Sequence, residues 1–213
     1  MQENPGWPHR GLYAITADRR DSDRLRHEIE AVLAAGVRLL QYRNKSATPA
    51  LRAEQARMLA QSCRVHGARL IVNDDVTLAF AVAADGVHLG SDDTGVAAAR
   101  AALGPGAIIG VSCYDSLARA RAARNAGASY LAFGACFEST TRPGRPRVTP
   151  ALFAQARAFG LPLVAIGGLR PDNAGVFVAA GADLIAAIGA LFDTPDPATA
   201  ALRFETLFQD TTA

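Results

Sequence analysis

The chain has 213 residues, of which 50% are hydrophobic and 20% are charged, and its formal net charge is +2. This length fits one domain with a large buried core, and so small a charge gives no support for nucleic-acid binding. The sequence holds no apolar run of about 18 residues, so we expect no membrane span. The three cysteines, Cys63, Cys113 and Cys136, lack metal-ligand spacing, which favours reduced thiols in a cytoplasmic protein.

Short apolar runs alternate with amphipathic segments along the whole chain. Strands are expected over residues 11–16, 37–45, 69–73, 86–90, 107–114, 129–137, 161–168 and 182–192. Helices are expected over residues 22–35, 49–67, 75–84, 95–103, 116–127, 150–159, 171–181 and 197–208. Alternation of this kind is typical of βαβ units and a parallel sheet.

Eight such units in just over 200 residues predict a (β/α)8 TIM barrel. We expect a single domain over residues 11–213, preceded by a short lead-in at 1–10. A doubly wound open sheet is the second interpretation, but no G-x-G-x-x-G follows the first strand. In a barrel of this kind the functional residues lie at the carboxyl ends of the strands.

Cationic side chains end the second predicted strand. Gln41, Arg43 and Lys45 share one face there, because side chains alternate along a strand. An arginine and a lysine together suit a pyrophosphate, since the first binds two oxygens at once and the second acts as a compact charge. The alternative is that Arg43 and Lys45 pair with carboxylates to hold the barrel mouth together.

Carboxylates follow the third and fourth predicted strands. The first apolar run stops at Asn73 and Asp74, and Asp93 follows the second. Carboxylates at the tips of neighbouring parallel strands can converge, and Mg²⁺ is commonly held by one or two of them together with substrate phosphates. The neighbouring Asp75 and Asp92 are better explained as helix caps, where aspartate is favoured.

Two polar residues lie within the fourth and fifth predicted strands. Ser112 offers a hydroxyl at the barrel mouth, although a serine whose hydroxyl is satisfied by the backbone is the alternative. His88 stands alone in an apolar strand, so we interpret it as a core residue with satisfied hydrogen bonds rather than as a ligand or a base.

Anion-binding features follow the last three strands. The segment 138–148 is the longest loop expected, and its hydroxyls and Arg142 could surround a phosphate and close as a lid. Glycines near the ends of the last two strands, Gly167, Gly168 and Gly189, let main-chain N–H groups approach an anion closely. One rim therefore offers a neutral monophosphate site and a cationic diphosphate site, which points to a transferase that expels pyrophosphate.

Over about residues 11–192 the chain resembles the thiamine-phosphate synthase family. The motifs that carry the resemblance are LYAIT, QYRNK, LIVND, ADGVHLGSDD, IIGVSCY, FGACFESTTR, VAIGG and the glycine segment of the last strand. The resemblance implies a Mg²⁺-dependent transferase that joins 4-amino-5-hydroxymethyl-2-methylpyrimidine diphosphate to a thiazole monophosphate and releases pyrophosphate. It implies small phosphorylated substrates and is compatible with a homo-oligomer.

The resemblance also implies residue roles. The pyrimidine diphosphate would be held by Gln41, Arg43, Lys45, Asn73, Ser112 and Arg142, of which Arg43, Lys45, Ser112 and Arg142 would act in catalysis. The metal would be held by Asp74 and Asp93. The thiazole phosphate would be held by Ser139, Thr141, Gly168, Ile188 and Gly189.

Three positions depart from the family pattern. Asn44 stands where glutamate is frequent, Arg142 where lysine is usual, and Gly189 where serine is common. Arg142 keeps the charge but not the geometry of lysine, and Gly189 leaves only main-chain amides. A thiazole tautomerase on the same barrel is the alternative function; it would need one phosphate site, no metal, and an acid or base at the mouth.

Overall fold

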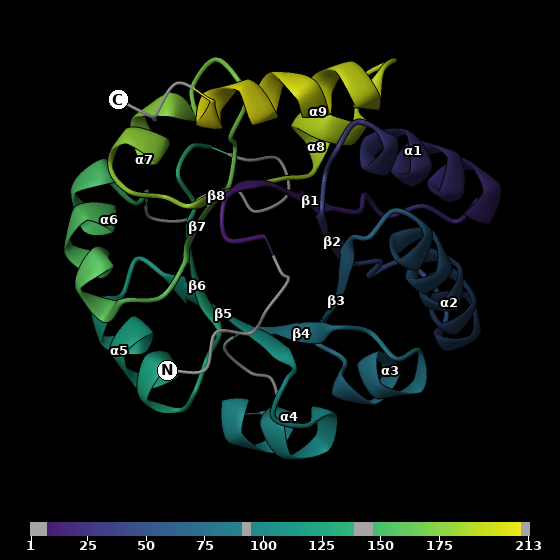
Figure 1. The fold of residues 1–213 in the computed structure, drawn as a ribbon, viewed down its shortest axis with the longest axis horizontal. Helices are drawn as coiled ribbons and strands as arrows, with labels where there is room; N and C mark the ends of the chain where they lie inside the picture. Colours follow the sequence, from purple (N-terminus) through teal and green to yellow (C-terminus); the bar gives the residue numbers. More distant parts are fainter. Residues whose placement is uncertain (1–7, 91–94, 139–146, 210–213) are drawn as a thin grey trace.

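The predicted closed barrel of parallel strands is confirmed (Figure 1). The structure, a computed structural model, describes residues 8–90, 95–138 and 147–209. Each strand pairs in parallel with the next in chain order, and β8 closes the ring against β1. The strands are β1 (Gly11–Ile15), β2 (Leu39–Tyr42), β3 (Arg69–Asn73), β4 (Gly86–Leu89), β5 (Ile108–Tyr114), β6 (Tyr130–Phe133), β7 (Leu163–Ile166) and β8 (Leu184–Ala187).

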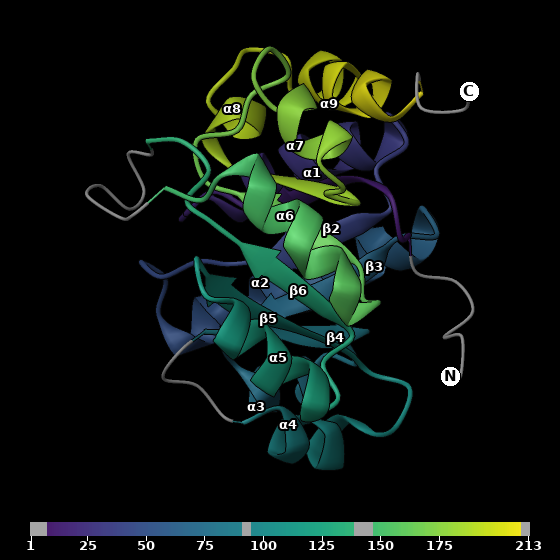
Figure 2. The same cartoon turned by 90° about the vertical axis from the view of Figure 1, so that its left-hand side faces the viewer.

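Helices surround the barrel on its outer side (Figure 1). The side view in Figure 2 shows α5 and α6 in front of β5 and β6. The helices are α1 (Ser22–Ala34), α2 (Pro49–Val65), α3 (Val76–Ala81), α4 (Val96–Leu103), α5 (Leu117–Asn125), α6 (Pro150–Ala156), α7 (Gly175–Ala179), α8 (Gly189–Phe192) and α9 (Pro197–Glu205), with 3₁₀ turns at Arg157–Phe159 and Thr206–Phe208. Within the described ranges no helix is long and apolar enough to cross a membrane.

Side-chain caps set where several helices begin. Asp21 accepts hydrogen bonds from the first-turn amides of α1, and Thr48 caps α2 just before Pro49. Asp75 caps α3 by accepting from the amide of Leu78, which confirms its interpretation as a capping residue. These caps fix the points at which the chain leaves the barrel mouth and turns into a helix.

Two layers of apolar side chains make up the interior. The larger layer lies between the sheet and the helices and includes all three cysteines, whose thiols are free. Burial raises the pKa of each thiol to about 12, so they are core residues rather than nucleophiles. The second layer fills the lumen with Tyr13, Ile15, Leu39, Ile71, Ile108, Tyr130, Ala132, Val164, Leu184 and Ala186, so the barrel is plugged below its mouth.

Most expected elements are shorter in the structure, as at 129–137, which is strand only over Tyr130–Phe133, and two differ by more than their ends. The expected strand 182–192 is strand only at Leu184–Ala187, and Gly189–Phe192 forms α8, because a short apolar run does not distinguish strand from helix. The expected helix 171–181 begins only at Gly175. Before it, Asn173 accepts from the amide of Arg170 and donates to the carbonyl of Gly168, and such local bonds compete with helix formation.

A carboxylate on α9 completes the start of β1. Glu205 Oε1 accepts a hydrogen bond from the amide of Leu12 at 3.0 Å, and burial raises the pKa of Glu205 above its usual value. We expect Glu205→Ala to lower the free energy of unfolding by about 1–3 kcal/mol, because the Leu12 amide loses its acceptor. Denaturant unfolding monitored by circular dichroism measures this.

Glu205→Gln is the matched control, since an amide oxygen can still accept from Leu12. A raised pKa in the folded state stabilises the fold fully below the pKa of the unfolded chain, and this contribution is lost as pH rises through the folded pKa. The glutamine variant cannot titrate at this position. As pH rises from the unfolded to the folded pKa of Glu205, its free energy of unfolding should therefore rise relative to that of the unmodified protein. Equal losses in the alanine and glutamine variants would contradict this role of Glu205.

Candidate active site

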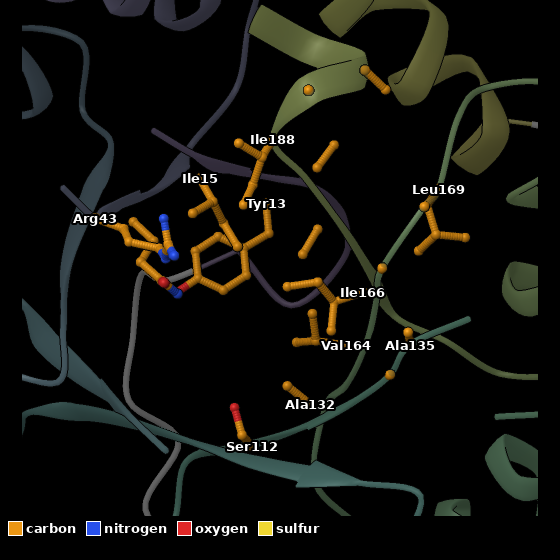
Figure 3. A pocket seen from close by; sticks show the side chains of 18 of the residues that line it. Tyr13, Ile15, Arg43, Ser112, Ala132, Ala135, Val164, Ile166, Leu169 and Ile188 are labelled. Atoms are coloured by element: carbon orange, nitrogen blue, oxygen red, sulfur yellow. The ribbon is translucent and has the colours of Figure 1, made fainter. Parts of the chain in front are cut away.

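A cavity of about 410 Å³ opens at the carboxyl ends of the strands. Its floor is the top of the lumen core, where Tyr13, Ala132 and Val164 line it. In Figure 3, Arg43 enters from the β2 side and Ser112 from β5, while Ile166 and Ile188 stand on the side of β7 and β8. The cavity therefore has a polar side, a glycine-containing side and a closed floor.

Arg43 is held on the polar side by two neighbours. Its amide donates to Thr16 Oγ1 at 2.8 Å, and that hydroxyl donates to its carbonyl at 2.7 Å, which joins the exits of β1 and β2. The guanidinium lies 3.0 Å from Asp18 Oδ1, and the side chain is only 16% exposed. Arg43 is thus largely buried, aimed into the cavity and paired at one nitrogen.

Lys45 and Asp74 face each other beside the mouth. Their charged atoms lie 3.6 Å apart, and about half of the Lys45 side chain is exposed. Asp74 has a left-handed backbone with φ of 63°, and the next residue, Asp75, is fixed by its cap and by an ion pair with Arg52. The rim pairing considered for Arg43 and Lys45 is therefore present for both cations, with Asp18 and Asp74 as their partners.

Ser112 and Asn73 complete the polar side from β5 and β3. Ser112 Oγ lies 2.9 Å from His88 Nε2, so this hydroxyl is bonded to a side chain rather than to backbone. His88 is 8% exposed and also lines the cavity. The expected core histidine is therefore largely buried and hydrogen-bonded, and it also reaches the candidate site.

The opposite side is made by glycines after β7. Gly167 and Gly168 have φ of 102° and 64°, a region that glycine adopts without strain. A Cβ on Gly168 would lie 2.3 Å from the carbonyl oxygen of Glu138. Only glycine therefore lets this turn pack against the segment that follows β6 while its main chain stays on the cavity wall.

We expect Gly168→Ala to lower stability by about 1–3 kcal/mol and to raise KM for a monophosphate substrate. The added Cβ must displace the Glu138 backbone and strains a left-handed residue. The control is Gly175→Ala at the start of α7, where a Cβ meets nothing within 4 Å. Thermal unfolding and steady-state kinetics measure both effects, and a Gly168→Ala enzyme that matches Gly175→Ala would refute the packing argument.

The structure brings together most of the predicted site. The predicted residues that line the cavity are Gln41, Arg43, Asn73, Ser112, Gly168, Ile188 and Gly189. Lys45 and Asp74 lie at the rim rather than among the lining residues. Asp93, Ser139, Thr141 and Arg142 fall outside the described residues.

Sequence reasoning missed several lining residues, among them Tyr13, Tyr114 and Asp193. The alternation of side chains along the first strand places Tyr13 in the lumen with Ile15 and could have identified it. Asp193 gave no signal, because it follows a short helix that the apolar run had concealed.

A closed parallel barrel with cations and glycines around one mouth defines a phosphate-binding (β/α)8 enzyme. The family model for thiamine monophosphate synthase matches residues 12–191. A thiamine-phosphate synthase of Methylobacillus flagellatus is 55% identical over 94% of this chain and 96% of its own length. The corresponding protein of Chromobacterium violaceum is 56% identical over 90% of this chain and 92% of its own length.

A solved structure agrees with these relatives. The thiamine phosphate pyrophosphorylase of Pyrococcus furiosus superposes with a TM-score of 0.84 at 30% identity, covering 97% of this chain and 98% of its own. This chain belongs to the thiamine monophosphate synthase family. The predicted function class, an enzyme of the transferase type in thiamine biosynthesis, is confirmed.

Proposed function

We propose that this enzyme joins 4-amino-5-hydroxymethyl-2-methylpyrimidine diphosphate to a thiazole monophosphate, forming thiamine phosphate and pyrophosphate. The observation that carries the proposal is the two-sided cavity. Arg43, Asn73 and Ser112 line one side, and the glycine turns after β7 and β8 line the other. Two anions of different charge can therefore bind at one mouth with their reacting carbon and nitrogen between them.

The diphosphate is assigned to the polar side. Arg43 offers a fork of N–H donors that matches two phosphate oxygens, and Lys45 adds a compact charge at the rim. Both already carry a carboxylate partner, Asp18 and Asp74 respectively. A diphosphate would compete with or share these partners, so the cations stay compensated before and after binding.

Arg142, predicted from sequence, would add a third positive charge to the diphosphate. The monophosphate is assigned to the glycine side, where main-chain amides of Gly168 and Gly189 are the donors proposed. Ser139 and Thr141, from the loop after β6, would complete that side as the sequence predicts. Ile188 lines the cavity beside them and supplies apolar contact for the thiazole ring.

The donor set at the rim suits Mg²⁺. Asp74 presents a carboxylate that is one-third exposed, and Asp93 is predicted to join it from the next strand. A bound Mg²⁺ would neutralise charge on the diphosphate oxygens as the C–O bond breaks. The described residues contain no cluster of three or more acidic, histidine or cysteine ligands, and substrate oxygens and water are the further ligands such a site uses.

The proposed reaction requires the protein to stabilise charge on the leaving group and to position the two substrates. The aminopyrimidine ring can donate electrons to the methylene carbon, so C–O cleavage can precede attack by the thiazole nitrogen. Arg43 and Lys45 would stabilise the departing pyrophosphate. The nitrogen is already a neutral nucleophile, so it needs placement by the glycine side rather than a base.

The direct test is to incubate the enzyme with both substrates and Mg²⁺ and to measure thiamine phosphate and pyrophosphate. We expect equal amounts of both products, and loss of both with a chelator. A thiazole tautomerase would convert the thiazole phosphate alone and would ignore the chelator. That outcome, or binding without product, would overturn the proposal.

We also propose that the enzyme works in the cytoplasm. The three free thiols in the core support this, because oxidising compartments favour disulfides. A homo-oligomer stays a prediction, to be measured by light scattering on the purified protein.

A further inference from the structure

Five side chains form an unbroken hydrogen-bonded chain across the barrel at the floor and polar side of the cavity. Gln41 Nε2 donates to the Tyr13 hydroxyl at 2.8 Å, and that hydroxyl lies 2.8 Å from the hydroxyl of Tyr130. Tyr130 Oη lies 2.9 Å from His88 Nδ1, and His88 Nε2 lies 2.9 Å from Ser112 Oγ. Five different strands contribute one residue each, and every member except Tyr130 lines the cavity.

In one direction of the chain, both phenol protons have an acceptor within it. The amide nitrogen of Gln41 can only donate, so the Tyr13 oxygen accepts. A phenolic oxygen can accept a second hydrogen bond, and both phenol protons have an acceptor within the chain only if Tyr13 donates to Tyr130 and Tyr130 donates to His88 Nδ1. Burial raises the pKa of both tyrosines well above the ordinary value, so both phenols keep the protons that this order requires.

The direction fixes the form of His88. Because Nδ1 accepts from Tyr130, the ring proton of a neutral imidazole must be on Nε2, which donates to Ser112. Packing holds the rings in register, with the imidazole stacked on Tyr130 at an interplanar angle of 22°. Ser112 thus accepts from His88, and its own proton is left to be donated elsewhere.

We propose that His88 is a positioning residue that makes Ser112 a hydrogen-bond donor toward the cavity. The inference rests on the proposed function for its ligand, an acceptor atom of the pyrimidine diphosphate. If the chain ran the other way, Ser112 would donate to His88 and would face the substrate with a lone pair. A donor suits the diphosphate side, where negative charge grows as pyrophosphate leaves.

The first test needs no substrate. Histidine side chains labelled with ¹⁵N and ¹³C report which ring nitrogen carries the proton, and the His88 signals are those missing from the spectrum of His88→Gln. We expect the neutral Nε2–H form at neutral pH, and a mixture of tautomers in Tyr13→Phe, because that variant removes the link to Gln41. A neutral Nδ1–H form or a doubly protonated ring in the unmodified protein would overturn the proposal.

The second test separates positioning from packing. A glutamine at position 88 can place its amide nitrogen near the site of Nε2, whereas an asparagine reaches only the site of Nδ1. We expect His88→Asn to lower kcat/KM for the pyrimidine diphosphate by about tenfold relative to His88→Gln, with KM for the thiazole phosphate unchanged. Equal losses in both variants, or none in either, would contradict the proposal.

A double variant tests whether His88 acts through Ser112. Ser112→Ala alone should lower kcat/KM relative to the unmodified enzyme. Combined with His88→Asn it should cause little further loss of kcat/KM, because the two residues act as one unit. Additive losses would show that His88 does not act through Ser112. If the unmodified enzyme formed no thiamine phosphate, the proposed function would fail, while the tautomer measurement would still decide the direction of the chain.

Discussion

Arg43→Ala is expected to lower kcat by about 10²–10³-fold without unfolding the enzyme. Removing one preorganised donor from developing negative charge has an effect of that size. Among the predicted cations that fall within the described ranges, only Arg43 both lines the cavity and has a largely buried side chain. Steady-state kinetics with the pyrimidine diphosphate, together with the melting temperature, measures the effect.

Two further variants of arginine sharpen this expectation. Arg43→Lys keeps the charge but loses the two-oxygen geometry, so its activity should lie between those of the unmodified enzyme and Arg43→Ala. Arg121→Ala on the exposed face of α5 should leave kcat unchanged. An Arg43→Ala enzyme with normal kcat would show that the diphosphate does not bind on this side of the cavity.

Asp74→Asn is expected to have the second large effect. It keeps the size and the left-handed backbone, which asparagine tolerates, but removes the charge proposed to hold Mg²⁺. The Mg²⁺ concentration for half-maximal activity should rise by at least about tenfold, since even indirect partners of a metal contribute 10- to 100-fold. A Mg²⁺ titration of the initial rate measures the shift.

A control and a binding readout accompany that variant. Asp23→Asn removes a carboxylate that is 93% exposed on α1 and should not change the Mg²⁺ requirement. Pyrophosphate with Mg²⁺ should raise the melting temperature of the unmodified protein and raise that of Asp74→Asn less. Identical Mg²⁺ titrations for the two variants would exclude Asp74 as a ligand.

The barrel could be predicted from the sequence because its strands and helices alternate and glycines mark where many helices end. RLIVN at 69–73 is a strand with the predicted bounds, and Gly36, Gly67, Gly127 and Gly160 mark helix ends with positive φ. The last unit was harder. In ADLIAAIGALF the apolar residues run through both β8 and α8, so nothing in the pattern marks the change at Gly189.

The candidate site was predictable where strand order alone decides it. Gln41, Asn73 and Ser112 line the cavity because they lie near the carboxyl ends of parallel strands in a closed ring. The pairing of Lys45 with Asp74 was not determined by order, because it depends on the left-handed turn at Asp74. Nor was the link from His88 to Tyr130, since 42 positions separate the two residues and they meet in the lumen from β4 and β6, on either side of β5.

The most direct measurement is a crystal structure of the enzyme with Mg²⁺, pyrophosphate and the thiazole phosphate. We expect pyrophosphate against Arg43 and Lys45, which follow β2, with the monophosphate beside Gly168 and Gly189 across the same cavity. Both anions on one side, or either anion bound away from the barrel mouth, would contradict this expectation.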